Sequence, residues 1–484
     1  MNFKQRKAYD FVVNWIDKKT SPGNRAEQLL LNISGRGGCG KTFWANCVTQ
    51  YALERAGYAF LLKGAPTGKA AFLLGGDTLH GLFQIPPKGS VKKELKPLDG
   101  ERLRELQDKF RNVELIILDE KSMIGLYTVY VIDQRLRQAK PQHAQKPFGG
   151  VSVCTMGDDA QLVPVNDTPR YCSKIEKFSP YQRDGAQLCN LFDKTIIFDE
   201  IMRQKGDDQK DFREILDSIS NGTFTKEQWQ KLKKRELYGN GDISKEESDQ
   251  FMAEGILICA YNKDLVKFNK QKIEALGTPI AKIKSENSSA CVAKLPANLA
   301  QGLMTQLWVA KNEKMILTTN LWKAAGLTNG AKCYVKYIVY EGKTKPPALP
   351  TMVIVEVPQY IGPGYKGMEK CVPIFPVKKD WYHSKRNVWR RMLPLKPGYA
   401  QNIHTSQGET ISEKYILNIG IKEFAAGLTY TGISRGTKWQ NLSFKPMYDY
   451  KRFKQIFNND TFKDRVKQEE REKESERRFL QDLG

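Results

Sequence analysis

The sequence predicts an α/β protein with two similar halves, each built around a parallel β-sheet. Three observations lead to this fold class. Apolar runs alternate with helical patterns along residues 1–194, the alternation resumes near Thr195, and 484 residues suffice for roughly three domains of ~150 residues. Between residues 331 and 397, short β-type runs broken by Gly and Pro predict a small β-barrel inserted in the second half.

The first half consists of predicted strands and helices in alternation. We expect strands at 28–34, 58–64, 113–120 and 151–158, and helices at 42–56 and 126–139. The stretch from residue 84 to residue 100 is rich in Pro, Gly and Lys. We interpret it as a small insertion or a surface loop.

The second half repeats the pattern with strands at 195–200 and 256–262 and a helix at 263–276. The α/β style returns after the predicted barrel, and the end of the chain is highly charged. The predicted domains are therefore 1–194, 195–330 together with 398–450, the insertion at 331–397, and a salt-bridged helical tail at 451–484.

The composition points to a polyanionic partner. Lys and Arg number 77 against 54 Asp and Glu, which gives a net charge of +23 spread along the chain. This excess fits a soluble protein that is merely basic, but it favours binding to nucleic acid over an acidic membrane. No apolar run approaches the ~18 residues of a membrane helix, and nine scattered cysteines form no CxxC pair. We expect no membrane or zinc and a reducing intracellular compartment, the nucleus or the cytoplasm.

The segment GRGGCGKT at 35–42 matches a phosphate-binding loop placed between a strand and a helix. Lys41 would reach the β- and γ-phosphates of ATP, and the hydroxyl of Thr42 would hold Mg²⁺. The rest of the loop would wrap the phosphates with its backbone N–H groups, and it consists of Gly35, Gly37, Gly38, Cys39 and Gly40.

Two further strand ends supply groups for hydrolysis. LIILDE ends in Asp119, which would lie near Mg²⁺, and Glu120, which would lie near the attacking water. An acidic strand end is common by itself, but after a phosphate-binding loop it indicates hydrolysis rather than binding alone. Gln161 in GDDAQLVPV would orient water or sense the γ-phosphate; the alternative is an ordinary polar turn.

Two arginines in the second half are candidates for neutralising charge on the γ-phosphate. Arg203 in EIMRQ and Arg435 in ISRGT lie near the two ends of that half. Most arginines of a basic protein are merely solvated, and only this placement distinguishes the two.

The segment IHTSQGET at 403–410 leaves several interpretations open. A histidine beside a serine and an acid suggests a hydrolase, a metal ligand or a polar loop that contacts another molecule. No G-x-S-x-G elbow surrounds Ser406, and no other histidine is close in sequence, which weakens the first two interpretations.

The order of these motifs resembles superfamily 1B DNA helicases. GRGGCGKT, APTGKAA, TLHGLF, LDEKSM, GDDAQLVPV, IHTSQGET and ISRGT follow one another as in the petite integration frequency (Pif-type) branch, with RecD-type enzymes next nearest. The resemblance runs from Gln5 to about Phe444 and implies two RecA-like domains, a wedge-bearing insertion at 84–111 and an SH3-like insertion at 331–397.

The resemblance also implies roles for individual residues. Gln5 matches the glutamine that reads adenine, and Gly408 and Glu409 match residues near the nucleotide. The residues that match DNA-contacting positions are Pro66, Thr67, Lys69, Thr78, His80, His404, Thr405 and Ser406. The implied activity is ATP-driven movement 5′ to 3′ on single-stranded DNA by a monomer that opens duplex junctions.

Four positions depart from the family pattern. Lys121 replaces an apolar residue, Asp159 an aromatic residue, Val163 a proline and Thr405 a basic residue.

An RNA helicase of superfamily 1 is one alternative, because the 2′-hydroxyl is recognised by contacts that charge cannot reveal. A nucleic-acid-binding module with a decayed ATPase is another, and intact Lys41 and Glu120 argue against it.

Overall fold

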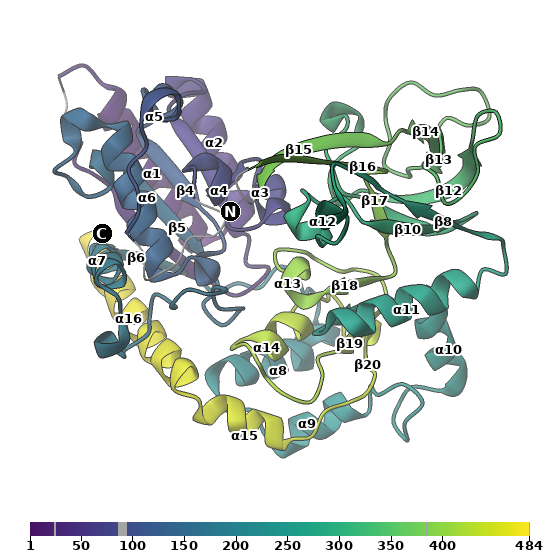
Figure 1. Cartoon of the computed structure of the whole chain (residues 1–484). Helices are drawn as coiled ribbons and strands as arrows, with labels where there is room; N and C mark the ends of the chain where they lie inside the picture. Colours follow the sequence, from purple (N-terminus) through teal and green to yellow (C-terminus); the bar gives the residue numbers. More distant parts are fainter. Residues whose placement is uncertain (24–25, 86–93, 384–385, 484) are drawn as a thin grey trace. The chain divides into compact units, whose positions relative to one another are not determined.

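The computed structural model describes residues 1–23, 26–85, 94–383 and 386–483 (Figure 1). The chain forms two compact units. Unit 1 contains residues 1–254 and 403–484, and unit 2 contains residues 255–402.

Unit 1 is built on a six-stranded sheet in the order β3-β2-β4-β5-β1-β6. Every neighbouring pair is parallel, which confirms the predicted α/β class with a parallel core. The strands are β1 (Leu30–Gly35), β2 (Leu61–Ala65), β3 (Asp77–Thr78), β4 (Leu115–Leu118), β5 (Ser152–Gly157) and β6 (Lys194–Phe198). Central strands β4 and β5 are buried along their whole length, as expected for a sheet covered on both faces.

Helices follow these strands in the expected alternation. They include α1 (Phe3–Thr20), α2 (Lys41–Ala56), α3 (Gly68–Leu74), α4 (Leu79–Leu82), α5 (Gly100–Phe110), α6 (Leu126–Ala139) and α7 (Pro180–Cys189). Gly57 ends α2 with a positive φ of 83°, where glycine avoids the strain of a β-carbon.

Strand β6 belongs to the first sheet, although the sequence pattern assigns it to the second half. It pairs in parallel with β1, with Ile196 opposite Ile33. The alternation of strands and helices predicts that a strand exists here. It does not predict which sheet accepts the strand, because main-chain pairing depends on tertiary neighbours.

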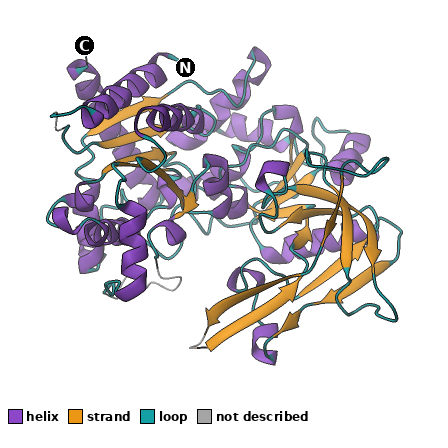
Figure 2. Ribbon diagram, turned by 90° about the horizontal axis from the view of Figure 1, so that it is seen from above, coloured by secondary structure: helices purple, strands orange, loops and turns teal. Residues whose placement is uncertain are grey.

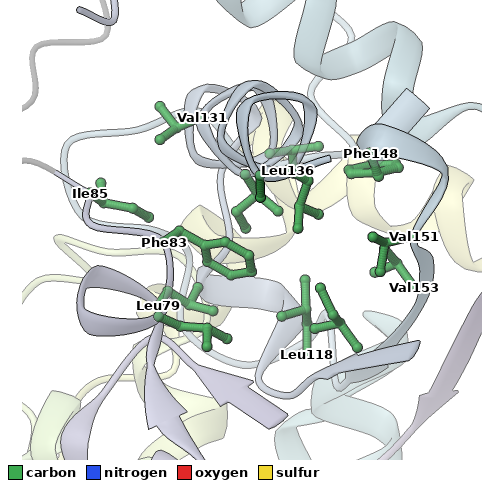
Figure 3. Packing of buried hydrophobic residues seen from close by; sticks show 14 of the residues in the cluster. Leu79, Phe83, Ile85, Leu118, Val131, Leu136, Phe148, Val151 and Val153 are labelled. Atoms are coloured by element: carbon green, nitrogen blue, oxygen red, sulfur yellow. The ribbon is translucent and has the colours of Figure 1, made fainter. Parts of the chain in front are cut away.

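The predicted insertion near residue 84 is partly anchored in the core. Residues 86–93 lie outside the described residues. In the part that follows, Leu95 and Leu98 are buried, and Phe110 of α5 stacks on Phe83 with ring centroids 5.7 Å apart. Figure 3 shows Phe83 and Leu118 pointing into this apolar cluster. The flank from residue 94 to 110 therefore contributes Leu95, Leu98 and Phe110 to the apolar cluster, although most of residues 94–99 are exposed.

Unit 1 contains further helices and two more strands. They are α8 (Lys210–Asn221), α9 (Lys226–Lys233), α10 (Lys245–Glu254), α13 (Ile403–Ser406), β19 (Tyr415–Asn418), α14 (Leu428–Ile433), β20 (Leu442–Phe444), α15 (Lys451–Asn458) and α16 (Asp460–Asp482). Strands β19 and β20 pair in parallel. Helix α16, yellow in Figure 1, lies along β6, and its Phe479 packs edge-on against Phe11 of α1 with ring centroids 4.9 Å apart.

Unit 2 is mainly antiparallel (Figure 2). A five-stranded sheet has the order β14-β13-β12-β11-β17, and β15 and β16 form a hairpin that is extended by β9. The elements are β7 (Ile256–Cys259), α11 (Asn262–Glu274), β8 (Ile280–Lys284), β9 (Glu286–Asn287), α12 (Ala290–Ala293), β10 (Gln306–Ala310), β11 (Lys314–Leu317), β12 (Lys332–Val339), β13 (Met352–Glu356), β14 (Cys371–Ile374), β15 (Val377–His383), β16 (Arg386–Met392), β17 (Leu395–Pro397) and β18 (Ala400–Asn402).

The compact unit extends beyond the predicted barrel at 331–397. Strands β12 to β17 fall inside that range, whereas β11 supplies Met315 and Leu317 to the same apolar core. Strand β9 lies before the range and pairs with β16. The sequence pattern predicts only the Gly- and Pro-rich part of this unit as a β-barrel. The strands that precede residue 331 are not predicted as part of it, because their pattern resembles the α/β pattern around them.

Candidate nucleotide site

The phosphate-binding loop joins β1 to α2 and requires glycine at two positions. Gly38 and Gly40 have φ values of 91° and 81°, in the left-handed region that favours glycine. A β-carbon at Gly38 would also overlap the side chain of Arg203, and one at Gly40 would lie 2.5 Å from Gln5 Nε2. The loop is therefore held tightly between side chains on both sides.

Lys41 is the first residue of α2, and its amine reaches back over the loop. Its Nζ donates to the carbonyl of Gly35 at 2.7 Å and to that of Arg36 at 3.0 Å. The ammonium group thus lies among carbonyl oxygens at the mouth of the loop, where it can exchange these weak acceptors for phosphate oxygens.

A cavity of about 380 Å³ opens in front of this loop, within the size range of small-molecule sites. Its lining comes entirely from unit 1. It consists of Gly37, Gly38, Gly40, Lys41, Thr42, Phe43, Ala70, Leu73, Asp119, Glu120, Asp158, Gln161, Met202, Arg203, Gly408, Thr410 and Arg435. The two acids, the glutamine and the two arginines singled out from the sequence therefore share one cavity with the loop.

The two acids after β4, Asp119 and Glu120, line the cavity. Asp119 accepts a hydrogen bond from the backbone N–H of Glu120 at 2.7 Å. Burial, with a smaller contribution from the charge of Glu120, raises the pKa of Asp119 to about 7. Glu120 has a φ of 55°, which is unfavourable for a residue with a β-carbon. Its carboxylate accepts a hydrogen bond from Gln407 Nε2 at 3.0 Å. The backbone conformation and this hydrogen bond together fix the position of the carboxylate.

Asp158 connects the strand end of β5 to the phosphate-binding loop. Its Oδ2 accepts from the backbone N–H of Gly37 at 2.9 Å, from Gln161 Nε2 at 3.2 Å and from the hydroxyl of Tyr430 at 3.0 Å. Although burial opposes ionisation, the positive charges of Arg36 and Lys41 lower the pKa of Asp158 below its ordinary value. A permanent carboxylate thus orients both the loop and Gln161.

The buried Arg435 and the half-buried Arg203 face the loop beside Gln161. A β-carbon at Gly37 would lie 3.1 Å from Arg203 Nη1, 3.3 Å from Gln161 Nε2 and 3.5 Å from Arg435 Nη2. Arg203 Nη1 donates to the carbonyl of Ser434 at 2.8 Å, and Arg435 Nε donates to that of Thr431 at 2.8 Å. Among the residues that the structure describes, no carboxylate forms an ion pair with either guanidinium.

This pair of like charges is unfavourable without an anion. Burial and then the charge of Arg435 lower the pKa of Arg203 to about 10, and burial lowers the pKa of Arg435 below its ordinary value. Arg203 and Arg435 both lie in the compact unit that carries the loop. A bound polyphosphate would relieve their repulsion, so the site is arranged to receive negative charge.

The residues also fit a magnesium ion beside a nucleotide. Thr42 supplies a hydroxyl and Asp119 a carboxylate at the same cavity, and hard oxygen ligands suit Mg²⁺. Across the described ranges there is no cluster of three His, Cys, Asp or Glu side chains that could hold a metal. A magnesium site here would accordingly rely on few protein ligands and on phosphate oxygens, which is usual for nucleotide sites.

Comparisons with known proteins show what this chain is similar to. Residues 1–230 match the model of the PIF1-like helicase family. The chain is similar to this family over just under half of its length. It is 24% identical to the ATP-dependent DNA helicase PIF1 of Homo sapiens over 402 residues, which cover 79% of this chain and 54% of that protein. It is 25% identical to Pif1 of Campylobacter jejuni over 423 residues, 84% of this chain and 86% of that protein.

A solved structure has a similar fold. Bacteroides Pif1 bound to single-stranded DNA superposes with a TM-score of 0.59 at 22% identity, over 91% of both chains. The chain spans about half the length of the Trypanosoma brucei and human relatives that it matches, with 49% and 54% of those proteins covered.

Three residues assigned by family resemblance have contacts that refine their interpretation. Gln5 is buried behind the phosphate-binding loop, where its Nε2 donates to the carbonyl of Cys39 at 2.9 Å. The carboxylate of Glu409 pairs with Lys69 Nζ at 2.6 Å. Gly408 has a φ of 78°, and a β-carbon there would lie 3.2 Å from the carboxylate of Glu120. Glu409 is therefore turned towards Lys69, and Gly408 alone of this pair reaches the cavity.

The candidate DNA-contacting residues of the first family motifs lie at helix starts. Thr67 caps α3 by accepting from the backbone N–H of Ala70 at 3.2 Å, and Thr78 caps α4 by accepting from Gly81 at the same distance. Pro66 is half-buried before the first cap, and His80 is exposed after the second. The two helix starts present backbone N–H groups, which favour phosphate.

The IHTSQGET segment divides between two roles. His404 stacks on Phe424 with ring centroids 6.4 Å apart, and Thr405 is exposed. Ser406 is fully buried, and its hydroxyl donates to the carbonyl of Ile403 at 2.8 Å. Ser406 therefore stabilises the turn of α13, which corrects its assignment to the DNA surface, and His404 and Thr405 remain candidates for DNA contact.

Sequence reasoning missed three residues that hold the site together. Gln407 supports Glu120, Asp158 orients Gln161, and Tyr430 donates to Asp158. The signal for Asp158 was present, because it is one of two acids at the end of an apolar strand. Nothing in the sequence separates Tyr430 from the other tyrosines.

Over the described residues, no helix has the length and apolar character needed to span a membrane.

Proposed function

We propose that this chain is an ATP-dependent DNA helicase that moves 5′ to 3′ along single-stranded DNA. The observation that carries the proposal is the convergence of Gln161, Arg203 and Arg435 on Gly37 of the phosphate-binding loop. Binding alone does not require three side chains at this point, whereas hydrolysis requires charge stabilisation where the γ-phosphate is attacked.

The chain's own residues divide the chemical work. Lys41 and the loop N–H groups bind the phosphates, and Glu120, held by Gln407, accepts a proton from the attacking water. Arg203 and Arg435 stabilise the charge that develops on the transferred group. When bound, Mg²⁺ held by Thr42 and Asp119 supplies charge neutralisation on the phosphate oxygens.

The DNA assignment rests on charge and on family relatives. The net charge of +23 favours a polyanion, and the matching human and Campylobacter proteins are named ATP-dependent DNA helicases. Contacts from Pro66, Thr67, Lys69, Thr78, His80, His404 and Thr405 would be made mainly to the phosphate backbone, which predicts strong weakening of binding by salt.

The domain roles are part of the same proposal. Residues 1–194 would form the first RecA-like domain, and 195–330 with 398–450 the second. The segments 84–111 and 331–397 would act as the wedge-type and SH3-like insertions. The chain would act as a monomer at junctions between single-stranded and duplex DNA.

A strand-displacement assay tests the proposal. Duplexes with only a 5′ tail or only a 3′ tail are mixed with the protein, ATP and Mg²⁺, and released strand is measured. Unwinding of the 5′-tailed DNA is expected, with Lys41→Ala as the inactive control. Preferential unwinding of the 3′-tailed DNA would refute the polarity, and activity confined to RNA duplexes would assign the protein to RNA.

A further inference from the structure

Lys121, directly after Glu120, is a buried cation with an unusual set of partners. It is 1% exposed, and its Nζ lies 2.9 Å from Asp159 Oδ2 and 2.8 Å from Glu472 Oε1. It also donates to Asn32 Oδ1 at 3.0 Å and to the hydroxyl of Ser34. The nucleotide chemistry described above uses none of these contacts.

Glu472 comes from the carboxyl-terminal helix α16 and is itself 5% exposed. Its Oε1 accepts from Asn32 Nδ2 at 2.9 Å, and its Oε2 accepts from the hydroxyl of Ser34. Asn32 and Ser34 lie on β1 immediately before the phosphate-binding loop. One carboxylate therefore ties the strand that leads into the loop to the residue that follows Glu120.

A second acid on α16 reaches the loop itself. Glu469 lies three residues before Glu472, and positions three apart share one face of a helix. Its Oε1 is 3.2 Å from Arg36 Nη1, and Arg36 is the second residue of the phosphate-binding loop. Arg36 also faces Asp158 at 3.7 Å. One turn of α16 thus contacts both chain segments that form the nucleotide site.

The backbone of Glu120 explains why such a tether matters. Its φ of 55° places it in a region that costs a residue with a β-carbon of order 1 kcal/mol or more, and such conformations persist only when the surroundings fix them. Lys121 begins the short 3₁₀ turn Lys121–Met123 that follows. Anchoring its amine restricts the turn, and with it the direction of the Glu120 carboxylate.

Helix packing alone does not account for this cluster. Helix α16 is already attached by Phe479 against Phe11 and by Asp464, which accepts from the backbone N–H and hydroxyl of Ser173 at 2.9 and 2.7 Å. A buried ion pair adds little net stability compared with apolar residues of similar size, because desolvation offsets the attraction. Its specific contribution is geometric.

We infer that Glu472 is a positioning residue for ATP hydrolysis, which holds Glu120 in its working orientation through Lys121, with Asp159 as the second anchor of the amine. Helix α16 is thereby a structural part of the ATPase site. The inference rests on the proposed function, because it assigns a role in the hydrolytic step.

The test compares two acid-to-amide substitutions on the same helix. Glu472→Gln removes the negative charge of the proposed tether and one of its two acceptor oxygens. Asp464→Asn is the matched control, because Asp464 is also buried and hydrogen-bonded but contacts no residue of the nucleotide site. For each full-length variant, kcat and KM for ATP and the melting temperature are measured.

Glu472→Gln should lower kcat by roughly 10–100-fold, as is typical when a partner that orients a reacting group is removed. KM for ATP should stay within about twofold, because the loop and Lys41 remain intact. Asp464→Asn should lower the melting temperature about as much as Glu472→Gln does, but it should retain the wild-type kcat. Adding Lys121→Met to Glu472→Gln should cause little further loss in kcat, because both act through one contact.

Equal kcat for the Glu472→Gln and Asp464→Asn proteins would overturn the inference. If Glu472→Gln does not fold, Glu472→Asp replaces it, because it keeps the charge but withdraws the carboxylate by one methylene. A Glu472→Asp protein with wild-type kcat would equally overturn it. Absence of ATP hydrolysis by the wild-type chain would instead refute the proposed function.

Discussion

Replacing Arg435 by methionine should strongly lower the rate of ATP hydrolysis while changing the free energy of unfolding only slightly. The guanidinium lies where a β-carbon on Gly37 would be 3.5 Å from Nη2, so it reaches the region of the γ-phosphate. An arginine that stabilises phosphoryl transfer contributes about 10³–10⁵-fold in kcat. The lower limit corresponds to about 4 kcal/mol of transition-state stabilisation. Turnover of Arg435→Met should therefore fall by about 10³-fold or more.

The fold should tolerate the same change. Arg435 donates to Thr431, Ser434 and Glu409, and these hydrogen bonds are worth about 1 kcal/mol each. Their loss is offset because methionine removes a buried cation whose pKa burial already lowers. The free energy of unfolding should change by no more than about 1–2 kcal/mol.

Phosphate release at saturating ATP, binding of a fluorescent nucleotide and thermal unfolding measure these three quantities. Arg390→Met is the matched control, because Arg390 is fully buried in unit 2 and donates to Asn287, Val292, Leu295 and Leu303. Its loss should lower the melting temperature and leave nucleotide affinity unchanged. An Arg435→Met protein that keeps more than about a tenth of wild-type turnover would show that this arginine does not act on the transferring phosphate.

Three further predictions concern the loop, the catalytic acid and unit 2. Gly38→Ala should weaken nucleotide binding, because a β-carbon at φ 91° would overlap Arg203; wild-type affinity in a direct binding assay would contradict this. Glu120→Gln should bind ATP normally but hydrolyse it at a small fraction of the wild-type rate, and normal turnover would remove Glu120 as the base. Glu313 in unit 2 is 1% exposed, and burial raises its pKa from 4.5 to about 8, a shift worth roughly 4–5 kcal/mol. Because the folded pKa is the higher one, its stabilisation is complete below pH 4.5 and is lost as pH rises through 8. Glu313→Gln should accordingly raise the melting temperature at pH 8 much more than at pH 5, and an equal effect at both values would contradict the shift.

The sequence predicts the phosphate site well because its parts are local. The glycine pattern, Lys41 and the acidic strand end are each contained within a few residues, and parallel strands bring their carboxyl ends to one edge. Contacts between residues that are far apart in the sequence could not be predicted, because the tertiary structure determines them. Lys121 and Asp159 stand out as separate departures from the family pattern, and only the fold shows that they form an ion pair.

Helix α16 illustrates a second limit. The charge pattern predicts a salt-bridged helix, and the helix is confirmed from Asp460 to Asp482. Its buried face includes Glu472 and Glu476. Hydrophobic periodicity identifies an inward face by apolar residues, so an acidic inward face looks like a solvated one.

The path of the chain through unit 1 sets an order of assembly during synthesis. Unit 2 is one continuous stretch, whereas unit 1 joins residues 1–254 to residues 403–484. The polar groups of Asn32 and Ser34 emerge from the ribosome early, and their partner Glu472 emerges 440 and 438 residues later. Domains form as their segments become available. The polar side chains of the first sheet therefore stay without this partner until α16 has been synthesised. A chain that ended before α16 would carry the phosphate-binding loop without the contacts of Glu469 and Glu472.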